Sequence, residues 1–322
     1  MNRLFLQVTY KCTSQCQHCF YCSGPKCETV LSSEAVERII EQTRPSEYVL
    51  FTGGEPSLAP DVVLRGLAVA KSLGIASWFC SNGSWGRDRR YADEFASAMT
   101  ANGLVRALIS VDALHQEFIP FDSVVNAIGA LRTAGIKTIK VLVTFVDRRK
   151  HLPIDQRTEE LVKLLNSEPG VTINPEVSFV GRAIYALNTY APKLTVDAAL
   201  DDHCEKENAS GMINDLSTCS SSFSTTIGAE GKVFICPSGF AYPGDLNSMS
   251  FADIVSKENI WGNKLMSNFQ SRGVRGLFDY AIGQGYIALE SYANKHHLCW
   301  HVRDFLRPKF PDILTPTHAY IG

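Results

Sequence analysis

Cys12-Thr-Ser-Gln-Cys16-Gln-His-Cys19 decides how this chain is interpreted, because it places three thiols within eight residues. Thiols this close cannot all pair as disulfides, and dense cysteine runs are how proteins hold iron-sulfur clusters and structural zinc. Structural zinc takes four protein ligands from two paired knuckles, and the continuation Phe20-Tyr21-Cys22 breaks that spacing. The motif therefore predicts a metal centre with one coordination position left open.

Short apolar runs alternate with stretches of helical periodicity up to about residue 190, which predicts a parallel sheet with crossover helices. The expected strands are residues 4–9, 48–52, 75–80, 105–111, 140–146 and 171–180, and the expected helices are residues 32–43, 62–69, 90–99, 124–134 and 159–165. Ser32 is the expected N-cap of the first helix, and Gly135 is the stop signal after residue 134. Six such units predict an α/β fold, a partial (β/α)6 TIM-like barrel with its active site where the strands end.

Gly53-Gly54-Glu55 follows the second expected strand. Two successive glycines let the backbone turn sharply and come close to a ligand, and the neighbouring carboxylate can accept a charged amine. On its own such a triplet is a common strand-to-helix turn. One βα unit after the cysteine motif, it indicates a ligand-binding loop.

Taken together, the C-x3-C-x2-C spacing behind a first strand resembles the signature of the radical S-adenosylmethionine (radical SAM) superfamily. The resemblance implies that Cys12, Cys16 and Cys19 bind three irons of a [4Fe-4S] cluster. The fourth iron then binds SAM, and one electron from a flavodoxin- or ferredoxin-type reductant releases a 5'-deoxyadenosyl radical. A chance cluster of buried or zinc-bound cysteines is the alternative.

The same resemblance implies roles for the loops that follow the other strands. Gly53, Gly54 and Glu55 would hold the amino group of the methionine moiety. Residues implied to reach the ribose, carboxylate or adenine of SAM are Asn82, Ser110, Asp112, Gly181 and Arg182, with His18 stacking on the purine. For the polar turn residues, satisfying the local backbone is an equally good interpretation.

From about residue 195 the chain becomes serine-rich and stops alternating. The spacing C-x11-G-x4-C from Cys219 to Cys236 resembles the core of SPASM and twitch domains, which add iron-sulfur clusters to radical SAM barrels. The resemblance implies a barrel at residues 1–190, and a C-terminal twitch/SPASM-like extension with helices at 195–322. It also implies a second, auxiliary [4Fe-4S] cluster on Cys204, Cys219 and Cys236, with Cys299 as the fourth ligand. Zinc on the same thiols is the alternative.

Composition limits the classes of binding partner and the cellular compartment that we expect for this chain. The net charge of −2 provides no general attraction to nucleic acid or to an anionic membrane. The N-terminus lacks the features of a signal peptide, and no segment reaches the eighteen or so consecutive apolar residues that a membrane helix needs. Ten cysteines without an export signal indicate a reducing compartment, which we expect to be the cytoplasm.

Radical SAM proteins with such extensions often modify ribosomal peptides, so epimerisation, crosslinking or other C-H chemistry on a peptide is the function that the resemblance implies. The motif begins at residue 12, so we expect no separate leader-binding domain before the barrel, which keeps a sugar, nucleoside or amino-acid substrate as an alternative. A non-catalytic metal or electron carrier is a further alternative. Cys80 would return a hydrogen atom to a substrate radical, and His115 would act as acid, base or substrate contact. A buried apolar thiol and a surface histidine are the plainer interpretations.

Overall fold

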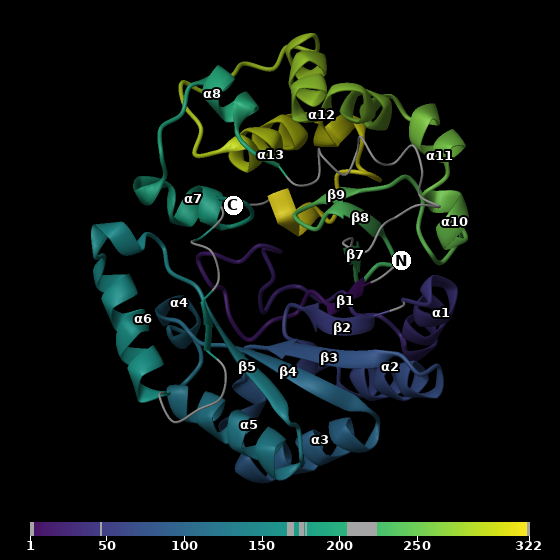
Figure 1. Cartoon of the computed structure of the whole chain (residues 1–322). Helices are drawn as coiled ribbons and strands as arrows, with labels where there is room; N and C mark the ends of the chain where they lie inside the picture. Colours follow the sequence, from purple (N-terminus) through teal and green to yellow (C-terminus); the bar gives the residue numbers. More distant parts are fainter. Residues whose placement is uncertain are drawn as a thin grey trace. The chain divides into compact units, whose positions relative to one another are not determined.

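The computed structural model describes residues 3–45, 47–165, 171–173, 177, 179–204 and 224–320. The chain divides into two compact units (Figure 1). The first consists of Met1–Gln17, Ser23–Val177 and Ile227–Glu230, and the second of His18–Cys22, Ser178–Thr226 and Gly231–Gly322. The division passes through the cysteine motif, because Cys12 and Cys16 belong to the first unit and Cys19 to the second.

A parallel sheet forms the centre of the first unit. Its strands are β1 (Arg3–Thr9), β2 (Tyr48–Gly53), β3 (Ala76–Ser81), β4 (Leu104–Ser110), β5 (Thr138–Val143) and β6 (Val171–Ile173). They lie in the order β6-β5-β4-β3-β2-β1, and every neighbouring pair is parallel. The predicted partial barrel is thus confirmed, as a sheet that does not close. Since parallel strands end at one edge, the loops after β1 to β4 meet there.

Helices follow the strands as the alternation predicts. They are α1 (Ser33–Thr43), α2 (Pro60–Ser72), α3 (Arg89–Ala101), α4 (Ala113–Gln116), α5 (Phe121–Thr133) and α6 (Pro153–Leu164), with 3-10 turns at Pro56–Leu58 (η1), Ser84–Arg87 (η2) and Arg148–Lys150 (η3). Figure 1 shows α2, α3 and α5 along the outer side of the sheet. Phe79 of β3 packs edge to face on Phe95 of α3, with ring centroids 6.0 Å apart. Alternate residues of β3 therefore face the helices, and Trp78 and Cys80 face the other way.

Local signals account for several element boundaries. The Ser32 side chain accepts a hydrogen bond from the amide of Ala35 at 3.1 Å, as its predicted N-cap role requires. Gly135 has a φ of +92°, which suits the residue after a helix end. The sixth helix begins at Pro153, earlier than predicted, since proline is well suited to the first turn of a helix. The predicted strand 171–180 is too long, because residues 177 and 179–180 are not part of β6.

The second unit is mainly helical in its described part. Its elements are α7 (Ala183–Ala186), η4 (Asn188–Tyr190), α8 (Val196–Asp201), β8 (Val233–Cys236), β9 (Phe240–Ala241), α10 (Phe251–Ile254), α11 (Lys257–Gly262), α12 (Lys264–Ile282), α13 (Lys295–Leu306), η6 (Arg307–Lys309) and η7 (Thr317–Tyr320). The strand β7 (Ser224–Ile227) spans the point in the sequence where the two units alternate. The β8–β9 hairpin is antiparallel, and α12 is kinked at Arg272 and Gly273.

The core of this unit is formed by apolar side chains from α8, the hairpin and the last two long helices. Its largest members include Phe240, Phe269, Tyr292, Trp300 and Tyr320. Among the described helices of the whole chain, none combines the length and the hydropathy that crossing a membrane requires.

Two histidines of α13, His297 and His301, lie side by side in the second unit. The Nε2 atoms of His297 and His301 lie 2.9 Å apart, and His297 Nδ1 accepts from the amide of Ala293 at 2.9 Å. Burial, together with the nearby His301 and Lys193, lowers the pKa of His297 to about 4. A histidine that stays neutral when folded stabilises the fold above its unfolded pKa, near 6.5, and this contribution is lost as the pH falls toward 4.

We therefore expect His297→Asn to flatten the acid dependence of stability. An asparagine Oδ1 can still accept from Ala293, but it does not titrate. Between pH 7 and pH 4.5 the variant should lose about 1–2 kcal/mol less than the natural chain, after allowance for solvent screening. Thermal melts across that range measure it, with exposed His151→Asn as the matched control. If the melting temperatures of His297→Asn and of the natural chain fell by the same amount between pH 7 and pH 4.5, this assignment would be refuted.

Candidate functional site

The cysteine loop leaves the sheet at the end of β1 and is tied at its base by backbone hydrogen bonds. The amide of Tyr10 donates to Thr29 O at 3.0 Å, and the amide of Cys12 donates to Gly24 O at 3.1 Å. Thr9 Oγ1 donates to Thr29 O at 2.9 Å. Cys16 is buried and Cys12 is partly exposed. The base of the loop is thus held firmly against β1, as a site that positions thiols requires.

Gly53 and Gly54 lie directly against the start of that loop. The amide of Gly54 donates to Thr9 O at 2.7 Å, and the amide of Glu55 donates to Lys11 O at 2.8 Å. Gly53 has a φ of +133°, and a Cβ there would overlap Thr9 O. A Cβ on Gly54 would overlap Lys11 O and lie 2.7 Å from Tyr10 O. Both glycines are therefore needed for close approach of two backbones, which the sequence interpretation assigned to a ligand.

Glu55 is completely buried and connects β2 to β3. Its Oε1 accepts from the hydroxyl of Ser81 at 2.8 Å and from the amide of Ser57 at 3.1 Å, and its Oε2 accepts from the amide of Asn82 at 2.8 Å. Burial raises the pKa of this carboxyl, although the hydrogen bonds from Ser57, Asn82 and Ser81 oppose that effect. Glu55 thus fixes the shape of two loops, which its sequence context alone did not indicate.

This geometry predicts a large stability effect for Glu55→Gln. Glutamine would turn an amide N–H₂ toward donors, so at least one of the buried groups at Ser81 and Asn82 would lose its acceptor. An unsatisfied buried polar group costs about 1–3 kcal/mol. Denaturant titration would measure the loss, with Glu94→Gln as control, because Glu94 forms only an exposed pair with Arg90. We call Glu55 and its three hydrogen-bond donors the Glu55 clamp. Equal denaturant midpoints for Glu55→Gln and Glu94→Gln would contradict the stabilising role of this clamp.

Asn82 connects this clamp to the cysteine loop. Its Nδ2 lies 3.1 Å from Thr13 Oγ1, 3.4 Å from Ser14 Oγ and 3.6 Å from Cys12 Sγ, while its Oδ1 accepts from the amide of Ser84 at 2.9 Å. An N–H that donates to sulfur favours the thiolate, the form in which cysteine binds metal. The donor set on this edge therefore fits a thiolate-bound metal cluster.

The contacts of three residues in this network were not predicted. Ser81 accepts at its Oγ from Trp85 Nε1 at 3.0 Å and from the amide of Gly83 at 3.0 Å, so it closes the turn from inside. Thr13 and Ser14 lie within the cysteine motif and supply its contacts to Asn82. Only their small polar character, between two cysteines, could have indicated this.

Cys80 and Ser110 lie at the ends of β3 and β4, as predicted. Burial raises the pKa of the Cys80 thiol to about 12, and the nearby Glu55 adds to the effect. Cys80 therefore keeps its S–H proton and is a poor nucleophile. Ser110 is partly exposed as the last residue of β4. A protonated thiol at this edge can serve as a source of a hydrogen atom.

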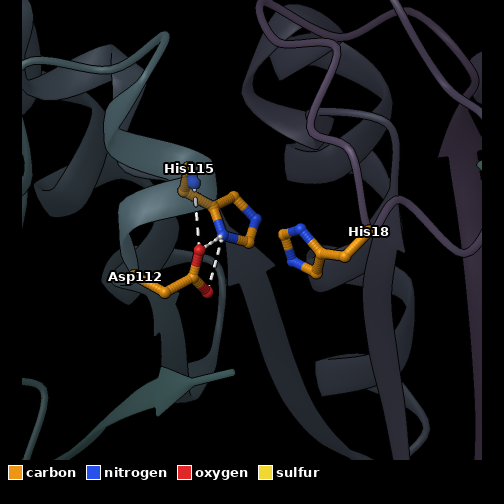
Figure 2. A group of neighbouring side chains, drawn as sticks. All are labelled: His18, Asp112 and His115. Carbon is orange, nitrogen blue, oxygen red and sulfur yellow. Dashed lines mark hydrogen bonds and ion pairs between the residues drawn. The ribbon is translucent and has the colours of Figure 1, made fainter. Parts of the chain in front are cut away.

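Asp112 and His115 form a dyad at the start of α4 (Figure 2). His115 Nδ1 lies 2.9 Å from both Oδ1 and Oδ2 of Asp112, and Oδ1 also accepts from the amide of His115 at 2.9 Å. Burial lowers the pKa of His115, but the charge and hydrogen bond of Asp112 outweigh it, so the net direction is upward. Asp112 is thus the N-cap of α4 and the partner of His115. His18, also drawn in Figure 2, belongs to the second unit.

Gly181 and Arg182 contact the short segment His18–Cys22 within the second unit. The amide of Arg182 donates to Cys19 O at 3.0 Å. Gly181 has a φ of +60°, and a Cβ there would lie 2.5 Å from the carbonyl oxygens of Cys19 and Phe20. The backbone around the third cysteine of the motif is thus held by this turn, a role that the sequence interpretation did not include.

A second group of thiols lies in the second unit. Cys236 ends β8, Cys299 lies on α13, and Cys204 follows α8. Burial raises the pKa of Cys299 to about 12, and Cys236 and Cys204 are close enough to raise it further, while Arg303 opposes them. Three of the four predicted auxiliary ligands are therefore close enough to interact. The fourth, Cys219, lies outside the described residues.

Comparisons with known proteins identify a family for part of the chain. Residues 6–150 match the family model described as the radical SAM superfamily. The YydG protein of Bacillus subtilis (strain 168), which is named for peptide biosynthesis, is 24% identical over 124 residues. The match covers 38% of this chain and 39% of YydG, so it spans about two fifths of that relative.

The fold is shared with a solved structure. Native anSMEcpe with bound AdoMet and Cp18Cys peptide superposes with a TM-score of 0.51 and 14% identity, covering 98% of this chain and 99% of that chain. SuiB from Streptococcus suis, bound to the precursor peptide SuiA, has a TM-score of 0.41 and 10% identity, covering 81% of this chain and 66% of that chain. The first of these likenesses extends the shared fold over nearly the whole chain.

Proposed function

The chain carries a radical SAM domain at residues 6–150 and is an enzyme, and from this premise we propose that it uses SAM to abstract hydrogen from a carbon of a ribosomally made peptide. The observation that carries the proposal is the contact of three loops at one sheet edge, where Asn82 bridges Glu55 and the cysteine loop. A carrier without catalysis has no need of such a ligand loop.

Cys12, Cys16 and Cys19 would hold the [4Fe-4S] cluster that the family implies. When bound there with SAM, and reduced by a flavodoxin- or ferredoxin-type partner, this group supplies the 5'-deoxyadenosyl radical. The protein contributes orientation and charge. Asn82 donates to the sulfur of Cys12, and Gly53 and Gly54 let the backbone after β2 pass against the cysteine loop.

The other predicted SAM contacts complete the proposed site. Glu55 would set the position of the loop that binds the methionine amine, since its own oxygens already accept three hydrogen bonds. The remaining proposed contacts are Ser110, Asp112, Gly181, Arg182 and His18. Of these, Asp112 also orients His115 through its contacts with Nδ1, and His115 is the proposed acid, base or substrate contact.

Cys80 is the proposed source of the hydrogen atom that quenches a substrate radical. This transfer would leave a thiyl radical on Cys80, which one electron from the proposed reductant and one proton would convert back to the thiol. It lies on the face of β3 that points away from the helices, and its raised pKa keeps the S–H bond intact. In this role Cys80→Ala leaves SAM cleavage in place but removes the incorporation of solvent deuterium into the product, and epimerisation is the outcome that most directly needs such a donor.

We propose that Cys204, Cys236 and Cys299, with Cys219, hold an auxiliary [4Fe-4S] cluster. Support comes from the effect of Cys236 and Cys204 on the pKa of Cys299, which brings together three separate segments of the second unit. Four thiols could equally hold zinc, so metal analysis decides between the two.

The peptide substrate is supported by the match to YydG, named for peptide biosynthesis, and by the fold shared with a structure that contains a bound peptide. Anaerobic reconstitution tests the whole proposal. We expect about eight irons per chain, as two [4Fe-4S] clusters require, and 5'-deoxyadenosine on reduction with dithionite. Deuterium transfer from a labelled precursor peptide into 5'-deoxyadenosine would identify the peptide as substrate. Zinc, or iron without SAM cleavage, would refute the enzyme assignment, and transfer only from a sugar, nucleoside or amino acid would refute the peptide.

A further inference from the structure

Arg303 on α13 is a buried cation in the second unit, with 1% of its surface exposed. Its Nη1 donates to Ser238 O at 3.1 Å and to the hydroxyl of Tyr320 at 3.2 Å, and its Nη2 donates to Ser238 Oγ at 3.3 Å. Its Nε donates to Cys299 O, one helical turn earlier, at 3.3 Å. The guanidinium is thus fixed on every side by groups that carry no charge.

No carboxylate forms an ion pair with Arg303 in the part of the chain that the structure describes. Two aromatic rings face the guanidinium, with its Cζ 5.8 Å from the centroid of Phe240 and 5.7 Å from that of Tyr320. Neutral acceptors and aromatic rings compensate only part of the cost of burying a charge. A buried cation of this kind needs an anion to balance it.

Burial raises the pKa of the Tyr320 hydroxyl, so the phenol beside Arg303 stays neutral. The other groups near Arg303 that can become anionic are the thiols of Cys236 and Cys299. Cys236 Sγ lies 3.2 Å from Ser238 Oγ, and the same oxygen accepts from Arg303. The backbone carbonyl of Cys299 accepts from Arg303 Nε, so the helical turn that carries this thiol is bound to the guanidinium. Arg303 and Ser238 therefore form a polar path to two of the proposed auxiliary ligands.

We propose that Arg303 is the internal counter-charge of the auxiliary cluster and that it raises the reduction potential of that cluster. This inference rests on the proposed function, because it requires iron on the described thiols Cys204, Cys236 and Cys299. Thiolates and cluster sulfides carry net negative charge, which increases on reduction. A fixed cation nearby favours the reduced state, since charge and hydrogen bonds to sulfur are what set cluster potentials.

The experiment isolates this cluster in the full chain by replacing Cys12, Cys16 and Cys19 with Ala. Iron content and the reduction potential, from a redox titration monitored by EPR, are then compared between this parent and its variants Arg303→Lys, Arg303→Gln and Arg303→Met. Arg307→Gln is the matched control, because Arg307 also lies over the Tyr320 ring, at 5.8 Å, but its side chain is 31% exposed and near Asp304.

In the neutral variants the ratio of reduced to oxidised cluster at a fixed potential should fall about tenfold or more, which corresponds to about 59 mV for one electron. Arg303→Lys and Arg307→Gln should stay near the parent. Loss of iron from both neutral variants, with retention in Arg303→Lys and folded spectra throughout, also supports the counter-charge. An unchanged potential in an iron-loaded neutral variant, or loss of iron from Arg303→Lys as well, overturns it. Absence of iron from the parent itself would refute the auxiliary cluster instead.

Discussion

Replacing Cys12, Cys16 or Cys19 with Ala is expected to reduce SAM cleavage to the level seen without protein. Each thiol is one of three proposed iron ligands, and a cluster that loses one of three protein ligands is no longer held in the position that leaves a single site for SAM. The measurement is 5'-deoxyadenosine formed after anaerobic reconstitution and dithionite reduction, with iron counted in the same samples.

Cys27→Ala is the matched control, because Cys27 lies in the same loop, where its amide donates to Gly24 O at 3.1 Å. That variant should keep both iron and SAM cleavage. Residual cleavage of natural magnitude in any one of the three alanine variants would exclude that cysteine as a ligand. The variants of Cys204, Cys236 and Cys299 should behave differently, with some cleavage left and product formation impaired.

Gly54→Ala is expected to have a large effect for a single added methyl group. Its Cβ would overlap Lys11 O, so the loop after β2 must move away from the cysteine loop. The hydrogen bonds from Gly54 to Thr9 O and from Glu55 to Lys11 O would be lost together. Overpacking of this kind costs about 1–3 kcal/mol, and the lost backbone hydrogen bonds add to it.

Gly129→Ala provides the comparison, because a Cβ on this glycine of α5 would meet nothing within 4 Å. Alanine there should stabilise the helix by about 1 kcal/mol. Melting temperature and SAM binding by equilibrium dialysis are measured for both variants. We expect Gly54→Ala to lose SAM binding and to melt lower, and Gly129→Ala to bind normally. Normal SAM binding by Gly54→Ala would show that the close approach of the two loops is not needed.

The strands and the order of the loops could be predicted from the sequence, because apolar runs and caps are local signals. Ser32 caps α1 as expected, and β1 to β5 lie within a few residues of their predicted positions. The start of α6 was misplaced, since residues 153–158 carry few apolar side chains and only Pro153 marks the helix start. Hydrophobic periodicity identifies a helix by its buried face, so it gives no signal over a stretch with few apolar side chains.

The sequence predicted which residues lie in the candidate site, but not which of them contact one another. Glu55 and Asn82 were recognised as loop residues, whereas their bond to each other depends on the register of β2 against β3. Asp112 was assigned to a cofactor, and the structure adds its N-cap role and its contact with His115. Such contacts depend on backbone geometry, which residue types alone do not specify.

Arg303 was missed entirely, and for a physical reason. On α13 it has the spacing of an ordinary helical arginine, and only the packing of the hairpin and of η7 around it makes it inaccessible to water. Gly181 was similarly linked to adenine, whereas its φ of +60° and its contact with Cys19 O are visible only in three dimensions. Burial of charge and close approach of backbones are tertiary properties.

The most direct test of the account is ENDOR spectroscopy of the reduced first cluster, in a chain whose auxiliary cysteines have been replaced by Ala, with SAM labelled by 17O in its carboxylate and 15N in its amine. If three thiols leave one iron vacant for SAM, both labels should show hyperfine coupling to the cluster, and the coupling should vanish when SAM is omitted. A cluster that is fully formed and reduced, yet shows no coupling to either label at saturating SAM, would contradict the central claim.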